Sequence, residues 1–289
     1  MPELPEVEVV KRSLTNKVRN LIIKRIKIND DRLRYRVDKK KIRKIIGLKL
    51  KKIERRSKLL LFHFHKNIIM LVHLGMTGKF FFIDQDKTKF KTSFYYNIDK
   101  TKDHKHDRVI FFLNKRRKLI YNDVRKFGFI KFLNNKDLNN NLHLKHLGPE
   151  PLGKFFNCTY FKQYIKCTDR TIKDVLMDQK FLSGIGNIYA NEILFLSKIK
   201  PSRKVKSLKE LEIKKIIKIT KRVLKASIKL GGSSIKDFST SNGEKGSFQQ
   251  YFRVYGKKGE HCSNTNCKNK IIKSTISNRA TFFCSKCQK

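Results

Sequence analysis

The chain opens with a helical hydrophobic period. Residues 5–14, PEVEVVKRSL, place Val7, Val10 and Leu14 on one face of a 3.6-residue repeat. Pro5 suits the first position of a helix, and the glutamates that follow it favour the first turn. The pattern therefore predicts an N-terminal helix over 5–14.

From residue 21 to residue 133 the pattern changes to short apolar runs typical of strands. Clusters of Gly, Asn, Asp and Lys separate the runs, and a polar, Lys-rich stretch at 84–107 interrupts them. Short strands at this spacing indicate a β-sandwich or a barrel. The predicted strands cover 21–28, 59–65, 68–74, 80–83, 109–113, 118–121 and 129–133.

An Asn-rich and then Gly/Pro-rich stretch at 134–153 is the best candidate for a domain boundary. Beyond it the hydrophobic period becomes helical, and a Gly/Ser-rich segment at 231–250 is predicted to be a loop. The predicted helices cover 156–166, 171–178, 187–196 and 208–230.

The last of these helices carries its own start and stop signals. We expect Ser207 as its N-cap, Glu210 at the capping-box position and Gly231 as its stop. Leu211 and Leu230 are expected on its apolar face.

Composition adds a partner class to this picture. The chain has 289 residues, 39% of them hydrophobic, which is enough for two domains and a small extra module. With 69 Lys+Arg against 24 Asp+Glu the net charge is +45, which favours a polyanion, nucleic acid above all. A chain heavy in Lys, Ile, Asn and Phe also fits a solvated surface shaped by a genome poor in G and C. The charge thus supports nucleic acid but identifies no contact.

Targeting and membrane signals are not recognisable in the sequence. No apolar stretch approaches the roughly 20 residues that span a bilayer. The start carries glutamates instead of a basic region and an apolar core, so it does not fit a secretory signal. We expect a soluble, intracellular protein.

Four of the six cysteines form a pattern suited to a metal. Cys262-x4-Cys267 and Cys284-x2-Cys287 are two pairs of soft ligands with sixteen residues between them. Tetrahedral Zn²⁺ takes four such ligands, and four thiolates leave no open position, so we predict one structural zinc. Two disulfides are the alternative, which an intracellular protein disfavours. Cys158 and Cys167 are predicted to be small buried residues.

The first residues carry candidate chemistry of another kind. Removal of Met1 exposes the secondary amine of Pro2, and an α-amino group with a pKa near about 7.7–8 is a better nucleophile at neutral pH than a lysine. Attack on a sugar carbon gives an iminium that favours loss of the base and then strand elimination. Glu3 and Glu6 are available as proton donor and acceptor. By composition alone, an ordinary Pro- and Glu-rich helix start is the simpler reading.

Nine motifs follow one another from residue 2 to the C-terminus. They are PELPEVE at the start, RRSK at 55–58, HLGMTG at 73–78, DVRKFG at 123–128, LGPEPL at 147–152, MDQKFLSGIGNIYANE at 177–192, IKDF at 235–238, VYGKKGE at 254–260 and NRATFFCSKCQK at 278–289. This ordered set, which is far more specific than any of its members, resembles the formamidopyrimidine-DNA glycosylases, bacterial enzymes that remove 8-oxoguanine and ring-opened purines from DNA.

The resemblance implies catalytic roles for four residues and a supporting role for Glu6. Pro2 would be the Schiff-base nucleophile and Glu3 the general acid/base near the sugar ring oxygen. Lys58 would donate a proton in β-elimination. Arg279, at the tip of a zinc hairpin, would contact the phosphates of the damaged nucleotide and assist δ-elimination.

The resemblance also implies DNA contacts. An enzyme acting on a base takes it out of the stack, and a wedge must fill the void. Met76, Arg125 and Phe127 match this void-filling trio, although the two apolar members also suit core packing. Asn187 would bind phosphate at a helix–two-turns–helix element, and the loop at 234–250 would close over the flipped base. Further matched positions at the DNA backbone are His106 and Lys173.

Three features depart from the family pattern. The first zinc knuckle has four intervening residues where the family typically has two. Val124 and Lys126 stand where Pro and Arg are usual. The high Lys content predicts strong nonspecific DNA binding with a steep salt dependence.

These observations predict an α+β protein that acts as a bifunctional DNA glycosylase/AP lyase on damaged double-stranded DNA. We expect a cytoplasmic, nucleoid-associated bacterial monomer with one Zn²⁺ and no membrane contact. An endonuclease VIII-like enzyme for oxidised pyrimidines and a non-catalytic zinc-containing DNA-binding protein are the alternatives. The predicted parts are an N-terminal catalytic β-sandwich at 1–134, a connector at 135–154, the helix–two-turns–helix domain at 155–250 and the zinc β-hairpin at 251–289.

Overall fold

The computed structural model describes residues 1–84, 91–93, 104–233 and 247–289. These residues form two compact units, which are described separately. The first unit comprises Met1–Lys145 and Leu230–Gln249, and the second comprises His146–Lys229 and Gln250–Lys289. The chain thus passes from one unit to the other inside the predicted connector, and 230–249 groups with the N-terminal unit instead of with the helices.

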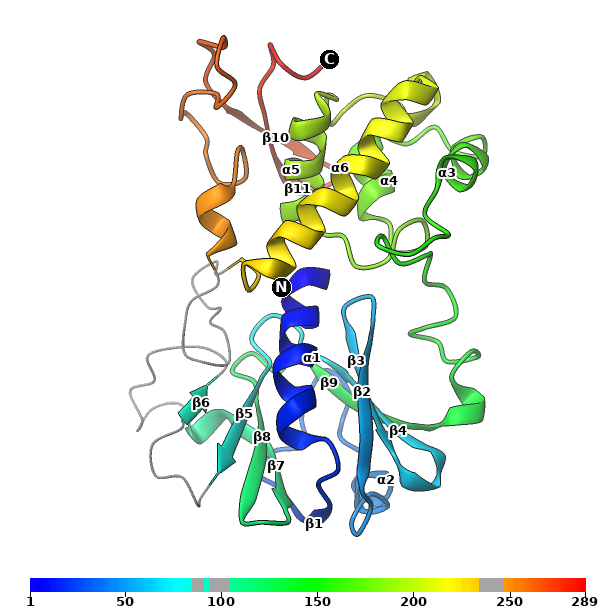
Figure 1. Ribbon diagram of the computed structural model, residues 1–289, viewed down its shortest axis with the longest axis vertical. Coiled ribbons are helices and arrows are strands. Elements are labelled where there is room, and N and C mark those ends of the chain that lie inside the picture. The colour runs from blue at the N-terminus through cyan, green and yellow to red at the C-terminus, as the bar shows by residue number, and fades with distance from the viewer. Residues whose placement is uncertain (85–90, 94–103, 234–246) are drawn as a thin grey trace. The chain divides into compact units, whose positions relative to one another are not determined.

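Two antiparallel sheets and one long helix build the first unit (Figure 1). One sheet has the order β1-β7-β8-β5-β6 and the other the order β2-β3-β4-β9. Apolar side chains of both sheets and of the helix α1 share one core, as the α+β prediction requires. The elements are α1 (Leu4–Val18), β1 (Ile23–Ile28), α2 (Lys39–Arg43), β2 (Leu50–Arg56), β3 (Leu59–Phe64), β4 (Ile68–His73), β5 (Lys79–Asp84), β6 (Lys91–Ser93), β7 (Asp107–Leu113), β8 (Arg117–Asn122) and β9 (Phe129–Asn134).

The helix α1 runs along the middle of the first unit, with β5, β7 and β8 on one side and β2, β3 and β4 on the other (Figure 1). It buries Val7, Val10 and Leu14, the face that the sequence pattern predicts, and continues four residues beyond the predicted end. Its N-terminus is fixed by a reciprocal capping box between Glu3 and Glu6.

Three elements of the first unit were missed by the sequence pattern, namely β2, α2 and the short strand β6 inside the polar stretch at 84–107. In β2 only Leu50 and Ile53 are buried, because a bulge between Leu50 and Lys52 breaks the two-residue alternation. The single turn α2 is dominated by lysines and is held by the Asp38 side chain, which accepts from the backbone N–H groups of Lys40 and Lys41.

Four helices and a hairpin make up the described part of the second unit. They are α3 (Cys158–Ile165), α4 (Ile172–Met177), α5 (Asn187–Ser197), α6 (Glu210–Lys229), β10 (Ile272–Ile276) and β11 (Arg279–Phe283). All four predicted helices are therefore present. The hairpin turns through Ser277 and Asn278, both with the left-handed backbone that a two-residue turn of this kind needs.

The start of α6 differs from the prediction. Ser207 ends a short 3₁₀ turn and is not the N-cap, since the helix begins at Glu210. The capping-box hydrogen bond expected from Glu210 is made by Glu212, whose carboxylate accepts from the backbone N–H of Lys209 at 2.8 Å. Leu211 was expected on the apolar face but is 78% exposed, whereas Ile213 in the same turn is 2% exposed, so the buried face of this turn is the one that carries Ile213.

Single-turn 3₁₀ helices complete the described structure at His65–Asn67, His104–His106, Asn135–Asp137, Val205–Ser207 and Phe248–Tyr251. Most of the polar, Lys-rich stretch at 84–107 lies outside the described residues. In the described ranges no helix has both the length and the apolar character needed to cross a membrane.

Candidate active site and nucleic-acid interface

The N-terminus of α1 holds two buried carboxylates directly after Pro2. Glu3 and Glu6 are 3% and 2% exposed. The backbone N–H of Glu3 donates to Glu6 Oε2 at 2.9 Å, and the Glu3 side chain accepts from the backbone N–H of Glu6. The capping box therefore fixes both predicted acid/base groups beside the half-buried Pro2.

The second oxygen of Glu6 is bound to the segment that follows α6. Ser233 donates to Glu6 Oε1 from its backbone N–H at 3.0 Å and from its hydroxyl at 2.9 Å. Ser233 also forms an isolated antiparallel bridge with Ser247. The two ends of the predicted lid thus meet at the start of α1, whereas 234–246 lies outside the described residues.

The turn between β2 and β3 presents Lys58 and is fixed from α1. Arg55 donates to Glu8 Oε2 through Nε at 3.0 Å and to the carbonyl oxygen of Ser57 through Nη1 at 2.9 Å. Burial raises the pKa of Glu8, but hydrogen bonds from Lys11, Arg12 and Arg55 outweigh this effect, so the net pKa lies below its usual value. Glu8 is therefore a stable anion that anchors the turn carrying Lys58, a role the sequence did not reveal.

A partly buried histidine, His73, lies near both Lys58 and the amine of Met1. Burial lowers the pKa of His73 to about 4, and the charges of Lys58 and of the N-terminal amine contribute to the shift. The His73 ring stacks on Phe129 at 5.5 Å, and its Nδ1 accepts from the backbone N–H of Gly75 at 2.9 Å. His73 is thus neutral, with its proton on Nε2, and the structure brings Lys58 and the chain start into one neighbourhood.

The predicted void-filling trio lies on two adjacent turns. Met76 is on the turn between β4 and β5, and Arg125 and Phe127 are on the turn between β8 and β9. Met76 and Phe127 are 43% and 46% exposed, which excludes the core-packing alternative. The Arg125 guanidinium lies 4.6 Å from the centroid of the Phe127 ring. His106 adjoins the second turn, since its carbonyl oxygen accepts from the backbone N–H of Asp123 at 3.1 Å.

In the second unit, the other predicted DNA residues meet at the start of β11. Lys173 is fully buried, and its Nζ donates to the carbonyl oxygen of Ala280 at 3.1 Å and to Thr281 Oγ1 at 2.7 Å. Asn187, the first residue of α5, donates to the same Ala280 oxygen at 2.9 Å. Arg279 immediately precedes this point and is exposed. Lys173 and Asn187 therefore hold the strand that presents Arg279.

The pKa of Lys173 agrees with its burial beside Arg279. Burial lowers the pKa of Lys173 to about 8, and the charge of Arg279 adds to the shift while Asp174 opposes it. The predicted contact of Lys173 with the DNA backbone stays a prediction, and its partners in the structure are internal.

Two further residues of α5 bind the hairpin and the segment at 253–255 that precedes it. Asn191 accepts from the backbone N–H of Phe282 at 2.7 Å. Glu192 accepts from the backbone N–H groups of Arg253, Val254 and Tyr255 at 2.8, 3.0 and 2.8 Å. Burial raises the pKa of Glu192 although these three bonds favour its charged form. Both residues belong to the quoted NIYANE segment, but nothing in a helical period distinguishes them as hairpin anchors.

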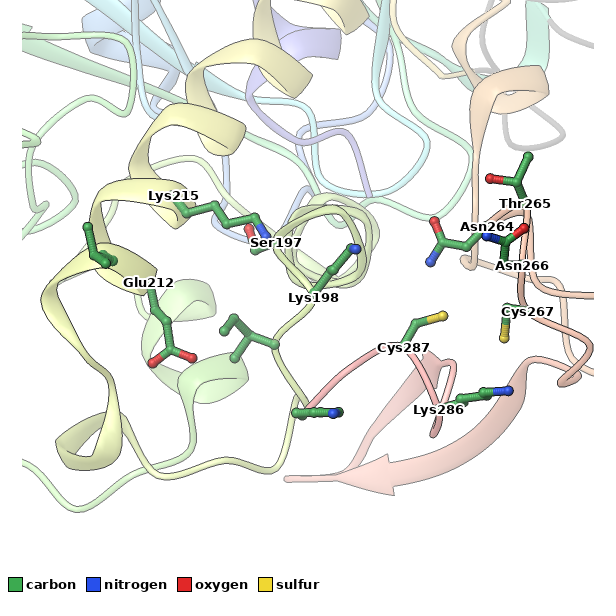
Figure 2. Close-up of a pocket in the computed structure, with 13 residues that line it drawn as sticks. Ser197, Lys198, Glu212, Lys215, Asn264, Thr265, Asn266, Cys267, Lys286 and Cys287 are labelled. Carbon is green, nitrogen blue, oxygen red and sulfur yellow. The ribbon is translucent and has the colours of Figure 1, made fainter.

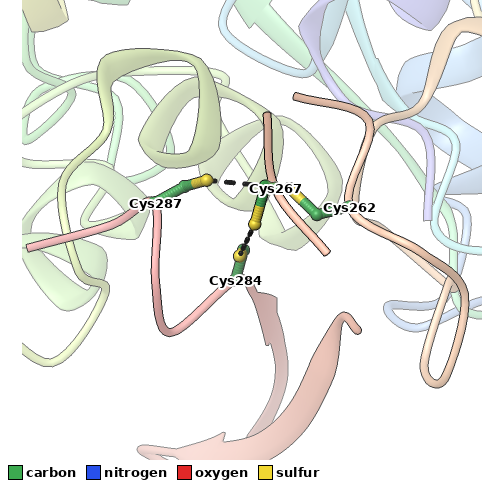
Figure 3. A group of neighbouring side chains, drawn as sticks. All are labelled: Cys262, Cys267, Cys284 and Cys287. Atoms are coloured by element: carbon green, nitrogen blue, oxygen red, sulfur yellow. Dashed lines mark hydrogen bonds between the residues drawn. The ribbon is translucent and has the colours of Figure 1, made fainter. Parts of the chain in front are cut away.

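The four predicted metal ligands converge near the C-terminal end of β11 (Figure 3). The Sγ atoms of Cys262 and Cys287 lie 3.8 Å apart, and those of Cys267 and Cys284 lie 3.6 Å apart. A tetrahedron with metal–sulfur bonds of about 2.3 Å has edges of about 3.8 Å, so the four thiols fit one ion. The longer first knuckle closes on itself, because Cys267 N–H donates to the carbonyl oxygen of Asn264 at 2.9 Å.

The other two cysteines do not follow the prediction of burial. Cys158 is partly exposed and Cys167 is exposed. Cys167 lies just beyond the end of α3, where the chain leaves the helical core.

A pocket of about 710 Å³ lies beside the first knuckle (Figure 2). Lys198, Lys215 and Lys286 line it together with Cys267 and Cys287. It is therefore at the cysteine end of β11, the end opposite to Arg279, and includes none of the predicted catalytic residues.

Comparison with known families covers most of the chain. Residues 1–130 match the family model described as the formamidopyrimidine-DNA glycosylase N-terminal domain. Residues 147–239 match the model of the formamidopyrimidine-DNA glycosylase H2TH domain.

Individual relatives agree with these models over the full length. The chain is 37% identical over 288 residues to the formamidopyrimidine-DNA glycosylase of Rickettsia massiliae, covering 100% of this chain and 97% of the relative. It is 35% identical over 289 residues to the protein of the same name from Roseobacter denitrificans, with 100% of both chains covered.

Solved structures of Lactococcus lactis Fpg share the fold. A mutant in complex with DNA containing Fapy-dG matches with a TM-score of 0.85 and 32% identity, covering 100% of both chains. A complex with DNA containing an abasic site matches with a TM-score of 0.84 and 32% identity, covering 99% of both chains.

Proposed function

The chain belongs to the formamidopyrimidine-DNA glycosylase family, and we propose that it excises oxidised purines from duplex DNA through a Schiff base formed by Pro2. It is a DNA glycosylase and AP lyase of base excision repair. The single observation that carries the proposed mechanism is the start of α1, where Pro2 directly precedes two buried carboxylates locked in a capping box.

The chemistry follows from the amine that Met1 removal exposes. The Pro2 nitrogen attacks the sugar carbon that bears the base, the carbon–base bond breaks, and the base leaves with a proton. The nitrogen gives up its own proton, Glu3 protonates the sugar ring oxygen, and the bond between that oxygen and the same carbon breaks, so the ring opens and an iminium forms. The resulting iminium draws electrons from the neighbouring carbon–hydrogen bond. Loss of that proton expels the 3′ phosphate in β-elimination, and a second elimination expels the 5′ phosphate.

The other predicted catalytic residues fit this sequence of steps. The charges of Lys58 and of the Met1 amine both contribute to the lowered pKa of His73, so both lie near this ring, which supports a role for Lys58 as a proton donor in β-elimination. Glu6 holds the Glu3 backbone and supports the capping box. Arg279 is exposed at the hairpin tip, where it contacts phosphates of the damaged nucleotide.

The DNA contacts follow from base flipping. Met76 and Phe127 enter the void that the flipped nucleotide leaves, and Arg125 meets the orphaned base. His106 and Asn187 contact the phosphate backbone, and Lys173 approaches it beside Arg279.

The ion held by the four cysteines is Zn²⁺ in this proposal. Four thiolates complete a tetrahedral shell, so the ion stabilises the hairpin and takes no part in the chemistry. Cys262, Cys267, Cys284 and Cys287 supply the shell.

The proposed substrate class agrees with the solved relatives in complex with DNA containing Fapy-dG, although another Lactococcus lactis complex holds DNA containing an oxidised pyrimidine. We place the protein in the bacterial cytoplasm with the nucleoid DNA and expect it to act as a monomer.

Borohydride trapping tests the mechanism directly. Borohydride reduces the iminium to a stable amine, so the mature protein should form a covalent adduct with a duplex containing 8-oxoguanine opposite cytosine. Pro2→Gly should abolish the adduct, and Lys58→Met should slow elimination. Lys51→Met, at an exposed position of β2, is the matched control and should behave as wild type. An undiminished adduct in Pro2→Gly, or none with the wild type, would contradict the proposal.

The endonuclease VIII-like alternative is separated by substrate. PELPE at the start and the exposed Arg125–Phe127 pair favour the purine enzyme. Faster excision of thymine glycol than of 8-oxoguanine from matched duplexes would reverse the assignment.

A further inference from the structure

The two turns that carry the void-filling trio are joined by a buried carboxylate and a hydroxyl. We infer that Asp123 and Thr77 are positioning residues that set where Arg125 and Phe127 stand before DNA is bound. This inference rests on the proposed function of the trio and goes beyond it by naming what holds the wedge.

The connection is a directed chain of hydrogen bonds. Asp123 is fully buried, and its Oδ1 accepts from the Thr77 hydroxyl at 2.5 Å. Because Thr77 has one hydroxyl proton and gives it to Asp123, its oxygen is free to accept, and it accepts from the backbone N–H of Arg125 at 3.0 Å. The other oxygen, Asp123 Oδ2, accepts from the backbone N–H of Gly128 at 2.9 Å. One carboxylate therefore controls both sides of the 124–127 segment.

The two turns are also packed too closely to slide. A Cβ on Gly75 would lie 2.4 Å from the backbone nitrogen of Gly128. A Cβ on Gly128 would lie 1.9 Å from the Tyr121 hydroxyl and 2.6 Å from the carbonyl oxygen of His73. Only glycine at both positions permits this approach, so the hydrogen bonds act between rigid partners.

A second set of bonds fixes the outer side of the same turn. Arg108, itself buried, donates through Nε to the carbonyl oxygen of Asp123 at 2.8 Å and through Nη1 to Asp30 at 3.2 Å. Lys126 pairs with the same Asp30 carboxylate at 2.7 Å. The lysine that departs from the family pattern is thus used to hold the turn.

The void-filling side chains need this buried support for a physical reason. Met76, Val124 and Phe127 are 43%, 43% and 46% exposed, so in the free protein their position is only partly set by packing. Side chains that must be exposed in order to enter a void are best aimed by the backbone beneath them. Asp123 and Thr77 provide that support from the buried side.

The test removes the hydroxyl and keeps the shape. In Thr77→Val the Arg125 N–H and one Asp123 oxygen lose their partner, whereas Thr77→Ser keeps both bonds. Loss of a hydrogen bond to a charged group, if it is felt fully in the transition state, changes a rate by about tenfold to a hundredfold. Thr77→Val should therefore lower kcat/KM for 8-oxoguanine excision from duplex DNA by about that factor. Thr77→Ser should stay close to wild type.

Two further measurements distinguish a role in positioning the void-filling trio from a general loss of activity or stability. An abasic site in single-stranded DNA has no opposite base and no void, so its cleavage by Thr77→Val should stay within about twofold of wild type. Amide hydrogen exchange of 123–128 in the free protein should accelerate in Thr77→Val but not in Thr77→Ser. Thr220→Val is the matched control, because within the described residues its buried hydroxyl has no hydrogen-bond partner.

The outcomes separate the inference from the function on which it rests. Equal losses on duplex and single-stranded substrates, or unchanged exchange in Thr77→Val, would overturn the positioning role even if the protein excises 8-oxoguanine. A wild type that neither excises nor traps would refute the proposed function, and the exchange measurement would still decide whether Thr77 and Asp123 fix the turn.

Discussion

The buried cation in the second unit makes a prediction whose sign and size follow from its surroundings. Lys173 is fully buried and has a pKa of about 8, against about 10.4 for an unperturbed lysine. Its two hydrogen bonds to Ala280 and Thr281 link α4 to β11. The perturbation that isolates its charge is Lys173→Met, which keeps most of the apolar stem and removes the titrating group.

The expected effect is a pH-dependent difference in stability. Between about pH 8 and pH 10.4 the unfolded chain holds a proton on Lys173 that the folded chain has released, so the free energy of unfolding of the wild type rises with pH. Each pH unit contributes about 1.4 kcal/mol, and the full shift corresponds to about 3 kcal/mol. Below pH 8 both states are protonated and this contribution is constant. Lys173→Met lacks it at every pH.

The lost hydrogen bonds add an offset that does not depend on pH. Ala280 O and Thr281 Oγ1 lose a donor in Lys173→Met, which costs about 1–3 kcal/mol at any pH. Other groups that titrate in this range are common to both proteins and cancel in the difference. The slope of the difference with pH therefore reports on the buried charge alone.

Urea unfolding followed by circular dichroism at 222 nm measures this slope. The second unit contains α3, α4, α5 and α6, which together hold more helical residues than α1 and α2 of the first unit, so the helical signal chiefly reports the unit that contains Lys173. Reductant and added Zn²⁺ keep the cysteine site constant from pH 7 to pH 10. A difference between wild type and Lys173→Met that stays flat or falls over this range would refute the assignment of a depressed lysine.

Three further changes test other parts of the structure. Glu192→Gln replaces an acceptor of three backbone N–H groups and should lower the free energy of unfolding by about 2–4 kcal/mol in urea titrations, whereas Glu212→Gln, at a partly exposed ion pair, should cost less than about 1 kcal/mol. Gly128→Ala should lower Tm sharply because its Cβ collides with backbone and hydroxyl oxygens. Gly153→Ala, where the nearest atom is 3.2 Å away, should be nearly neutral. Equal Tm values for the two variants would contradict the packing argument. Metal analysis should find one Zn²⁺ per chain, and Cys284→Ser or chelation should release it with loss of amide protection in the hairpin; retention of protection without metal would show that the ion is dispensable.

The fold could be predicted wherever one hydrophobic period dominates a segment. The helix α1 and the strands rich in Leu, Ile and Phe satisfy this condition, and their bounds differ from the prediction by a few residues. The strand β2 does not, because a bulge and a run of charged residues hide its alternation. Leu211 was assigned to an apolar face by its spacing, but the first turn of α6 buries Ile213 and leaves Leu211 exposed.

The candidate site could be predicted as a set of residues but not as a connected structure. Motif positions identify Pro2, Glu3 and Lys58, and cysteine spacing identifies the metal ligands from the residues alone. The residues that fix the site were missed, because each contact joins distant parts of the chain. The Glu8–Arg55 pair at the Lys58 turn is 47 residues apart, and the Thr77–Asp123 pair at the Arg125 turn is 46 residues apart. In a chain with 69 basic residues a single Arg–Glu pair leaves no detectable sign in the sequence.

Burial gives a physical way to find the important cations in such a chain. An exposed lysine stays hydrated, so it can be gained or lost with little change in stability. A buried cation loses hydration and persists only where nearby groups compensate for that loss. Arg108 and Lys173 meet this condition, since both are buried and both donate to backbone carbonyl oxygens that fix a predicted DNA-contact segment. Arg279 is exposed and does not meet it, and in the proposed function its partner is the phosphate backbone of the DNA. The net charge of +45 therefore supports binding to DNA in general, whereas the specific chemistry depends on a few cations whose partners, internal or on the DNA, are defined by geometry.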